Sequence, residues 1–196
     1  ADTIGQAEQD THTRMIVIQS TGDTFSAGND ISEFAAQSAK TVGLERNVTR
    51  FLHQLATTTV PIMAAVQGKA VGIGTTLLLH CDYVLLAEDA QLITPFVNLA
   101  LVPEAASSLL MPARIGHVRA FELFSLGEPL CAQKALEWGL ANKIVPNNTL
   151  HAEAKEIARR FASKPIGSLR ATKKLMRNHT EIQNQIAIES TLFSER

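Results

Sequence analysis

The sequence lacks an excess of charge of either sign. Its 196 residues include 18 Lys+Arg and 19 Asp+Glu, which gives a net charge of −1. A nucleic acid or an anionic membrane is therefore not expected as the main partner. No apolar run approaches the length of a membrane span, and no signal peptide is visible. These absences favour a cytoplasmic protein without a membrane span.

Cysteine is also scarce. Cys81 and Cys131 are the only two, and neither belongs to a set with the spacing of metal ligands. We expect no metal site, and we predict that both thiols are reduced and lie in or near the core. The hydrophobic fraction of 45% is ordinary for a globular chain of this length. Because the first residue is Ala1 rather than Met, we expect the true N-terminus to lie upstream.

The stretch 61–82, PIMAAVQGKAVGIGTTLLLHCD, organises the rest of the chain. An apolar run at 62–66 predicts a buried strand. Gly68, Gly72 and Gly74 follow, and then a helix with few charges at 75–81. Glycines allow close approach of the backbone to a ligand, and a helix start leaves amide N–H groups unpaired. Such groups can bind a phosphate or a developing oxyanion, although the glycines could equally serve only tight packing.

Strands alternate with helices up to about residue 145, which predicts an α/β domain with parallel strands over 1–145 and a helical region over 146–196. Strands are expected at 14–19, 62–66, 83–87, 91–94 and 143–145. A turn and a loop are expected at 20–30. Helices are expected at 31–38, 46–57, 75–81, 119–126 and 131–139, from Pro103 with an interruption at Pro112, and from 149 with breaks at Pro165 and near His179.

The order of several short motifs resembles the crotonase superfamily, which includes enoyl-CoA hydratases and isomerases. The motifs are SAGND at 26–30 followed by Ile31, GKAVGIG at 68–74, Cys81-Asp82, and Pro103-Glu104 followed later by Gly139-Leu140. Together with Thr94-Pro95-Phe96, they look most like the peroxisomal-type Δ3,Δ2-enoyl-CoA isomerase branch. That resemblance implies a peroxisomal location if the source is a eukaryote. The resemblance covers nearly all of 14–178. The family's usual opening strands are absent from this sequence.

The resemblance implies a fold of repeated ββα units with a C-terminal helical trimerisation region. It implies a homotrimer or a dimer of trimers, an acyl-CoA thioester substrate, and no cofactor, since coenzyme A is part of the substrate. By motif position, the backbone amides of Asn29 and Ile73 form the oxyanion hole. Asn29 could instead be a turn residue or a helix cap. The motifs also imply substrate contacts by Ser26, Ala27, Gly28, Asp30, Ile31, Lys69, Val71, Gly72 and Phe96.

The carboxylates decide which reaction is expected. In this family a hydratase uses two glutamates, and their positions match Thr76 and Phe96 here. Neither residue is an acid or a base, so hydration is not expected. Glu104 occupies the position of the isomerase base, within an apolar segment that should raise its pKa. The alternative is a surface glutamate that stabilises a helix N-terminus.

Other polar residues have ordinary interpretations. His80 is expected to be a satisfied core histidine, and Asp82 to bind the backbone beside a strand. Lys173 and Lys174 could approach CoA phosphates or lie on a solvated helix face. Apolar residues of the last helix, Ile182, Ile186, Ile188, Leu192 and Phe193, are expected to pack on a neighbouring subunit.

The sequence therefore predicts an enoyl-CoA isomerase with Glu104 as base and with Asn29 and Ile73 as oxyanion donors. The alternatives are another crotonase reaction, such as thioester hydrolysis, and a non-catalytic acyl-CoA-binding subunit.

Overall fold

The computed structural model describes residues 1–29 and 44–195. The helix expected at 31–38, its potential cap Asp30 and most of the loop expected at 39–45 lie outside the described residues. Among those that are described, no helix is both long and apolar enough to cross a bilayer, and no cluster of His, Cys, Asp and Glu could hold a metal ion.

The central sheet consists of four parallel strands in the order β1-β3-β5-β8. They are β1 (Ile16–Gln19), β3 (Ile62–Val66), β5 (Tyr83–Ala87) and β8 (Lys143–Val145). The expected parallel strands are confirmed here, with β3 paired to β5 from Met63↔Tyr83 onwards. Every residue of β3 is buried. Successive side chains point to opposite faces, and both faces are covered, which explains why the run is apolar without alternation.

A second sheet of short strands has the order β2-β4-β6-β7. It contains β2 (Thr24–Ser26), β4 (Lys69–Val71), β6 (Gln91–Ile93) and β7 (Leu130–Cys131). Only β6 was expected as a strand; β2 was expected as a loop, β4 as a glycine-rich turn and β7 as part of a helix. The β6–β7 pair is antiparallel, so this pair contradicts the expectation of parallel strands. Strands of two or three residues are too short to show a periodic pattern of apolar residues, so the sequence did not reveal β2, β4 and β7.

Pairs of strands followed by a helix recur along the chain, as the ββα prediction requires. β1 and β2 precede α3 (Leu44–Thr57), and β3 and β4 precede α4 (Ile73–Thr76), which continues as the 3₁₀ helix η1 (Leu77–His80). β5 and β6 precede η2 (Val97–Leu99) and the pair α5 (Ser107–Ile115) and α6 (His117–Leu126). α7 (Ala132–Glu137) and the 3₁₀ helix η3 (Asn147–Thr149) flank β8. The fold is therefore the crotonase-like α/β fold that the sequence predicts.

The helix expected to open at Pro103 begins later. α5 starts at Ser107, because Ala105 and Ala106 both have a left-handed backbone, with φ of 62° and 56°. Pro112 lies inside α5 without ending it, contrary to expectation. The helix ends instead at Gly116, whose φ is 84°.

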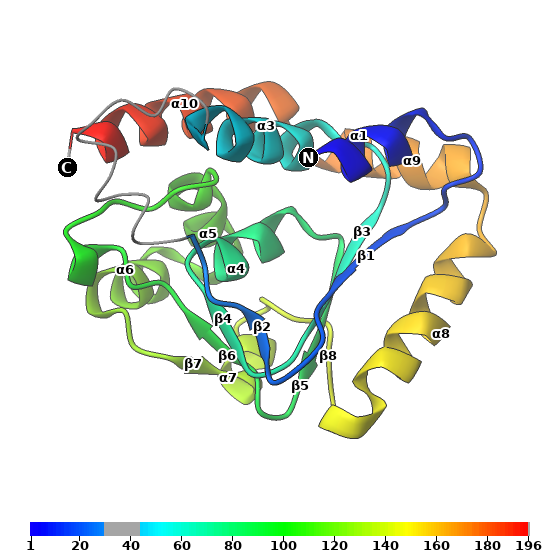
Figure 1. Cartoon of the computed structure of the whole chain (residues 1–196), viewed down its shortest axis with the longest axis horizontal. Coiled ribbons are helices and arrows are strands. Elements are labelled where there is room, and N and C mark those ends of the chain that lie inside the picture. Colours follow the sequence, from blue (N-terminus) through cyan, green and yellow to red (C-terminus); the bar gives the residue numbers. More distant parts are fainter. Residues whose placement is uncertain (30–43, 196) are drawn as a thin grey trace.

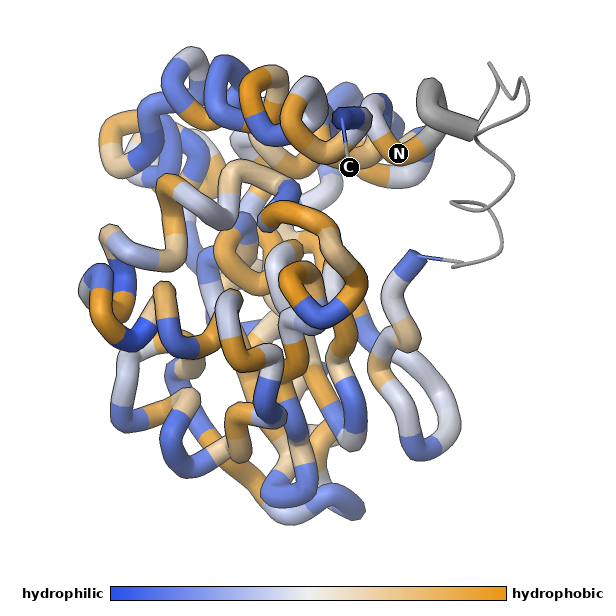
Figure 2. Tube along the Cα trace, turned by 90° about the vertical axis from the view of Figure 1, so that its left-hand side faces the viewer, coloured by the Kyte–Doolittle hydropathy of each residue, from blue (hydrophilic) through white to orange (hydrophobic). Residues whose placement is uncertain are grey.

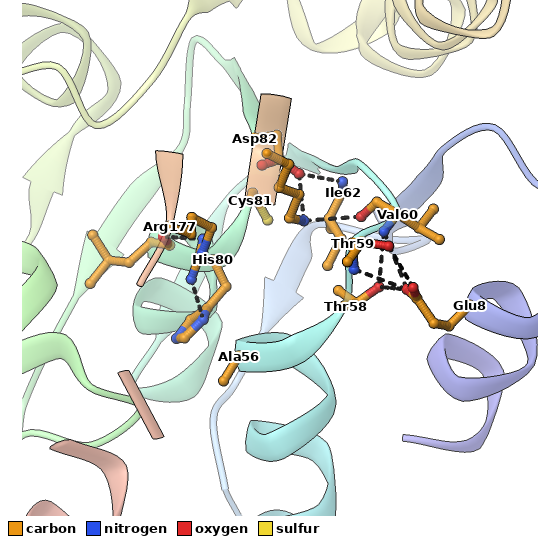
Figure 3. Close-up of polar contacts among 12 residues, drawn as sticks. Glu8, Ala56, Thr58, Thr59, Val60, Ile62, His80, Cys81, Asp82 and Arg177 are labelled. Atoms are coloured by element: carbon orange, nitrogen blue, oxygen red, sulfur yellow. Dashed lines mark hydrogen bonds and ion pairs between the residues drawn. The ribbon is translucent and has the colours of Figure 1, made fainter. Parts of the chain in front are cut away.

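Four helices lie along one side of the molecule (Figure 1). They are α1 (Asp2–Gln9), α3, α9 (Ile166–Met176) and α10 (His179–Ser194), while α8 (Leu150–Ala162) covers the central sheet elsewhere. The expected breaks at Pro165 and near His179 are confirmed. Glu8 of α1 accepts hydrogen bonds from Thr58 Oγ1 and the amides of Thr59 and Val60, which ties α1 to the segment before β3 (Figure 3).

The core lies on both faces of the central sheet, and hydrophobic segments concentrate in the middle of the molecule (Figure 2). Ile62, Ala64 and Val66 belong to the larger cluster, whereas Met63 and Ala65 face a smaller one beneath α8. One prediction about the cysteines needs correction. Cys131 is exposed, although Cys81 is buried as expected.

The last helix packs on its own chain more than predicted. Ile182 and Ile186 are buried in the larger core cluster, so they are not free to contact a neighbouring subunit. Ile188 and Leu192 remain exposed, at 54% and 43%. The error arose because the sequence does not show that α10 runs beside α3 and α5.

Candidate active site

Two backbone turns that are far apart in the sequence lie against each other, one after β2 and one after β4. A Cβ added to Gly28 would come within 3.0 Å of the Val71 carbonyl oxygen, and one added to Gly74 within 2.7 Å of Ser26 Cβ. Gly28 has φ of 88°, and its amide donates to Ser26 Oγ over 3.2 Å. The glycines therefore serve close packing here, which was the plainer of the two interpretations. That packing also brings the two predicted amide donors into neighbouring turns.

The turn at Gly72 shapes the start of α4. Its φ of 54° is left-handed, and a Cβ there would meet nothing within 4 Å. The Gly72 carbonyl accepts from the amides of Thr75 and Thr76 at 2.9 and 3.0 Å. Within the described residues, the amides of Ile73 and Asn29 have no hydrogen-bond acceptor. The Ile73 amide is thus an unpaired donor at a tight helix start, which is the type of donor that an oxyanion requires.

The predicted substrate contacts differ in exposure. Ala27 and Lys69 are exposed, and Val71 is half-buried at the end of β4. Phe96 is 5% exposed and packs on Phe124, with ring centroids 6.1 Å apart. Asp30 and Ile31 lie outside the described residues.

Glu104 is buried beside α4. It is 9% exposed, and Thr76 Oγ1 donates a hydrogen bond to Glu104 Oε1 over 3.3 Å. Burial raises the pKa of Glu104 from 4.5 to about 7; the Thr76 bond lowers it, and the charge of Glu189 raises it further. Ile73 and Thr76 lie three residues apart on α4, and therefore on one side of this short helix. α4 thus joins the Ile73 amide to the hydroxyl that contacts Glu104.

A second buried carboxylate supports the segment after Glu104. Glu189 of α10 is 3% exposed and accepts from the Ala106 amide at 2.6 Å and the Ser108 amide at 2.9 Å. Ser108 Oγ also donates to it. The sequence analysis did not identify Glu189, because it lies on a helix whose contacts with residues 106–108 only the fold reveals. One signal was present, namely a lone acidic residue among the apolar positions of 182–193.

His80 holds the same segment from the other side. His80 Nε2 lies 2.7 Å from the Ala105 carbonyl oxygen. His80 Nδ1 lies 3.0 Å from Arg177 Nη2 (Figure 3). One neutral tautomer satisfies both contacts, since Nε2–H donates and Nδ1 accepts. Burial and the Arg177 charge lower the pKa of His80 to about 3. His80 is therefore the satisfied core histidine that was predicted.

Lys173 is neither on a solvated face nor placed for phosphate contact, so both of its expected roles are wrong. It is 5% exposed, and its Nζ lies 2.7 Å from Asp82 Oδ2 and 2.9 Å from the Val60 carbonyl oxygen. Asp82 Oδ2 also accepts from the Ile62 amide at 2.8 Å, as expected for a backbone-binding aspartate (Figure 3). The pair joins α9 to the beginnings of β3 and β5.

Comparisons with known proteins show the family to which this chain belongs. The sequence model of the family described as enoyl-CoA hydratase/isomerase matches residues 1–196. The chain is 33% identical over 170 residues to the 1,2-epoxyphenylacetyl-CoA isomerase of Escherichia coli, covering 84% of this chain and 65% of that protein. It is also 33% identical over 174 residues to the enoyl-CoA delta isomerase 2 of Rattus norvegicus, covering 85% of this chain and 44% of the rat protein. The chain thus spans less than two thirds of the length of these two curated relatives.

Solved structures agree closely with the fold. The enoyl-CoA hydratase/isomerase from Pseudoalteromonas atlantica superposes with a TM-score of 0.92 at 38% identity, covering 99% of this chain and 77% of that one. OdaA from Pseudomonas aeruginosa gives a TM-score of 0.90 at 40% identity, covering 99% of this chain and 79% of that one.

Proposed function

This chain belongs to the enoyl-CoA hydratase/isomerase family, and on that premise we propose that it moves the double bond of a 3-enoyl-CoA to the 2-position. The observation that carries the proposal is Glu104, a buried carboxylate whose pKa is raised to about 7. A general base works best when its pKa lies near the operating pH. Among the relatives, the rat protein is named an enoyl-CoA delta isomerase, which agrees with this proposal.

In the proposed reaction, Glu104 removes a proton from C2 of the substrate. The electron pair moves into the thioester carbonyl to form a dienolate, whose oxygen accepts hydrogen bonds from the Asn29 and Ile73 amides. Glu104 then returns the proton to C4, and the double bond comes to lie between C2 and C3. One proton leaves and one returns, so a single carboxylate suffices. Loss of one such oxyanion donor typically costs about 3–4 kcal/mol of transition-state stabilisation.

The polar groups near Glu104 favour isomerisation over hydration. Thr76 and Phe96 stand where the resemblance places the two glutamates of a hydratase. Glu189 is the other carboxylate whose charge acts on Glu104, but two amides and the Ser108 hydroxyl already occupy it. A carboxylate engaged in this way is poorly suited to activating water.

The direct test is incubation with 3-enoyl-CoAs and 2-enoyl-CoAs of several chain lengths, followed by separate detection of isomer and of 3-hydroxyacyl-CoA. We expect isomerisation of the 3-enoyl substrates and negligible hydration of the 2-enoyl ones. Fast hydration would contradict the proposal. Release of free CoA would indicate thioester hydrolysis, and binding without turnover would indicate a non-catalytic acyl-CoA-binding subunit.

We further propose that the chain assembles as a trimer or as a dimer of trimers. The support is a set of exposed apolar side chains on α6, where Val118, Phe121 and Leu126 are 78%, 64% and 55% exposed. Exposed patches of this kind mark association surfaces. Sedimentation should give a mass several times 21.2 kDa at micromolar concentration, and a stable monomer would contradict the proposal.

A further inference from the structure

The backbone directly after Glu104 adopts a conformation that is costly for its residues. Ala105 and Ala106 have φ of 62° and 56°, and neither is glycine. A left-handed conformation costs about 1–2 kcal/mol for each such residue. Two in succession persist only where the surroundings hold them, and such strain is often found at functional sites. Contacts from elsewhere in the fold must therefore fix this turn, which directly follows the predicted base.

Glu189 makes the contacts that fix it. Its two carboxylate oxygens take the amides on both sides of Ser107, at 2.6 Å for Ala106 and 2.9 Å for Ser108. Ser108 Oγ also donates to Glu189, and it accepts in turn from Gln185 Nε2 at 2.8 Å. These amides open α5, where a negative charge is favoured by the helix dipole. Glu189 accepts three hydrogen bonds and donates none, as an ionised carboxylate does.

The rest of the turn has separate partners. The Ala105 carbonyl accepts from His80, and the Glu104 carbonyl accepts from the Ser107 amide at 3.0 Å. The charges that face this region are few. Glu189 acts on Glu104 from α10. His80 of η1, with a pKa of about 3, is neutral at ordinary pH, and its Nδ1 faces Arg177, the residue directly after α9. Among the described residues, Glu189 is thus the charged group that hydrogen-bonds to the turn.

We propose that Glu189 is a positioning residue for the Glu104 base: it holds the left-handed Ala105–Ala106 turn, and through that turn it fixes where the Glu104 carboxylate lies. A residue of α10 would then determine the geometry of a base that lies 85 residues earlier in the sequence. This inference rests on the proposed function for its kinetic consequences. The geometry of the turn does not depend on which reaction is catalysed.

The test compares Glu189→Gln with Glu181→Gln. Glu181 lies on the same helix and is exposed, so its change removes the same charge away from the site. A glutamine in place of Glu189 would present its side-chain N–H₂ to one of the backbone amides and loosen the turn. We expect kcat to fall about 10- to 100-fold with KM nearly unchanged, since misplacement by about 1 Å can have that effect. Loss of the Glu189 charge should also lower the pKa of Glu104 and move the acid limb of kcat/KM to lower pH. The Glu181→Gln variant should match the parent in both.

Recovery of kcat in a double variant distinguishes a positioning role of Glu189 from a general contribution to stability. In the double variant Ala106→Gly/Glu189→Gln, glycine adopts the left-handed conformation without strain. We expect it to recover part of the lost kcat. Equal kcat and an unmoved acid limb in Glu189→Gln would overturn the proposal. If Glu189→Gln fails to fold, Ser108→Ala serves instead, because it removes one donor to Glu189. It should lower kcat several-fold at constant KM, and an unchanged kcat would then overturn the proposal.

One measurement separates this proposal from the isomerase proposal. The titration of Glu104 can be followed by carbon NMR of the side-chain carboxyl in the parent and in Glu189→Gln, without substrate. If the parent shows no isomerisation, the proposed function fails, but a lowered pKa of Glu104 in Glu189→Gln still supports the role of Glu189. If the parent is an active isomerase, an unmoved pKa together with an unchanged kcat in Glu189→Gln overturns that role while the proposed function stands.

Discussion

The hydroxyl of Thr76 lies 3.3 Å from Glu104 Oε1 and donates a hydrogen bond to it. This bond favours the charged form of Glu104 and lowers its pKa, against the larger effect of burial, which raises it to about 7. Thr76 stands where the family resemblance places a glutamate of a hydratase. Here the residue at that position supplies no carboxylate, and its hydroxyl instead lowers the pKa of Glu104.

Replacement of Thr76 by Val keeps the shape of the side chain and removes this hydrogen bond. The pKa of Glu104 should rise, so the acid limb of kcat/KM should move to higher pH, by about half to one pH unit for a bond worth about 1 kcal/mol. A pH–rate profile measures the change. Thr76→Ser retains the hydroxyl and should leave the limb in place; movement in both variants would point to packing instead.

Replacement of Glu104 by Gln keeps the size of the side chain and removes the base. We expect isomerisation of 3-enoyl-CoA to fall by about a hundredfold or more, the usual scale for a general base. Acyl-CoA binding, measured by calorimetry, should persist because the amides of Asn29 and Ile73 are untouched. Turnover near the parent rate would leave the isomerase proposal without its base.

The same variant tests the burial of Glu104 through stability. The folded-state pKa of about 7 lies above the ordinary 4.5, so folding favours the protonated form. This contribution is fully present below about pH 4.5 and is lost as pH rises through about 7, amounting to roughly 3 kcal/mol. The glutamine side chain of the variant does not ionise. Urea unfolding should therefore show the parent losing stability relative to Glu104→Gln between about pH 4.5 and 7, and parallel curves would contradict the buried assignment.

The buried pair of Lys173 and Asp82 should be structural. Lys173→Met would remove the ammonium that donates to both the Asp82 carboxylate and the Val60 carbonyl, while the Ile62 amide would still donate to Asp82. Breaking a buried pair on one side costs about 3–5 kcal/mol, and the partial exposure of Asp82 favours the lower end. The neighbouring Lys174 is exposed, so Lys174→Met should change the free energy of unfolding by less than about 0.5 kcal/mol. Equal effects in the two variants would refute this structural role.

Two glycines with similar backbone angles test the packing of the two turns. Gly22 and Gly28 have φ of 89° and 88°, but only Gly28 would bring a Cβ against Val71. Both alanine variants should lose about 1 kcal/mol of stability from backbone strain. Only Gly28→Ala should also lose activity, because it separates the Asn29 and Ile73 amides. Loss of activity in Gly22→Ala as well would mean that strain alone is responsible.

Much of the fold could be predicted because its signals are local and strong. The apolar runs at 62–66 and 83–87 became the two central strands, and Pro165 separates α8 from α9 as expected. The strands at 24–26 and 130–131 could not be found, since they are too short for a period and exist only through pairing with distant partners. The start of α5 was misplaced because a proline followed by a glutamate resembles the first turn of a helix. The left-handed backbone of Ala105 and Ala106, which delays the helix to Ser107, depends on contacts with distant parts of the chain.

The residues of the candidate site also fall into two groups, those that a local sequence motif reveals and those that only the fold brings together. Glu104, Asn29 and Ile73 belong to short motifs that the sequence displays, and their roles stay predictions. Glu189 and the burial of Lys173 depend on how α9 and α10 return to the rest of the molecule, which no local pattern encodes. Ile182 and Ile186 were interpreted as intersubunit contacts for the same reason, since their partners are distant in the sequence.

The return of α10 to the segment after Glu104 has a consequence for biosynthesis. Residue 189 leaves the ribosome long after residue 104. Ala105 and Ala106 are therefore synthesised before Glu189, which accepts the hydrogen bond of the Ala106 amide. Until the last helix emerges and docks, the amides of Ala106 and Ser108 lack the carboxylate that binds them in the finished molecule. The order in which the chain is made therefore places maturation of this site after the synthesis of α10.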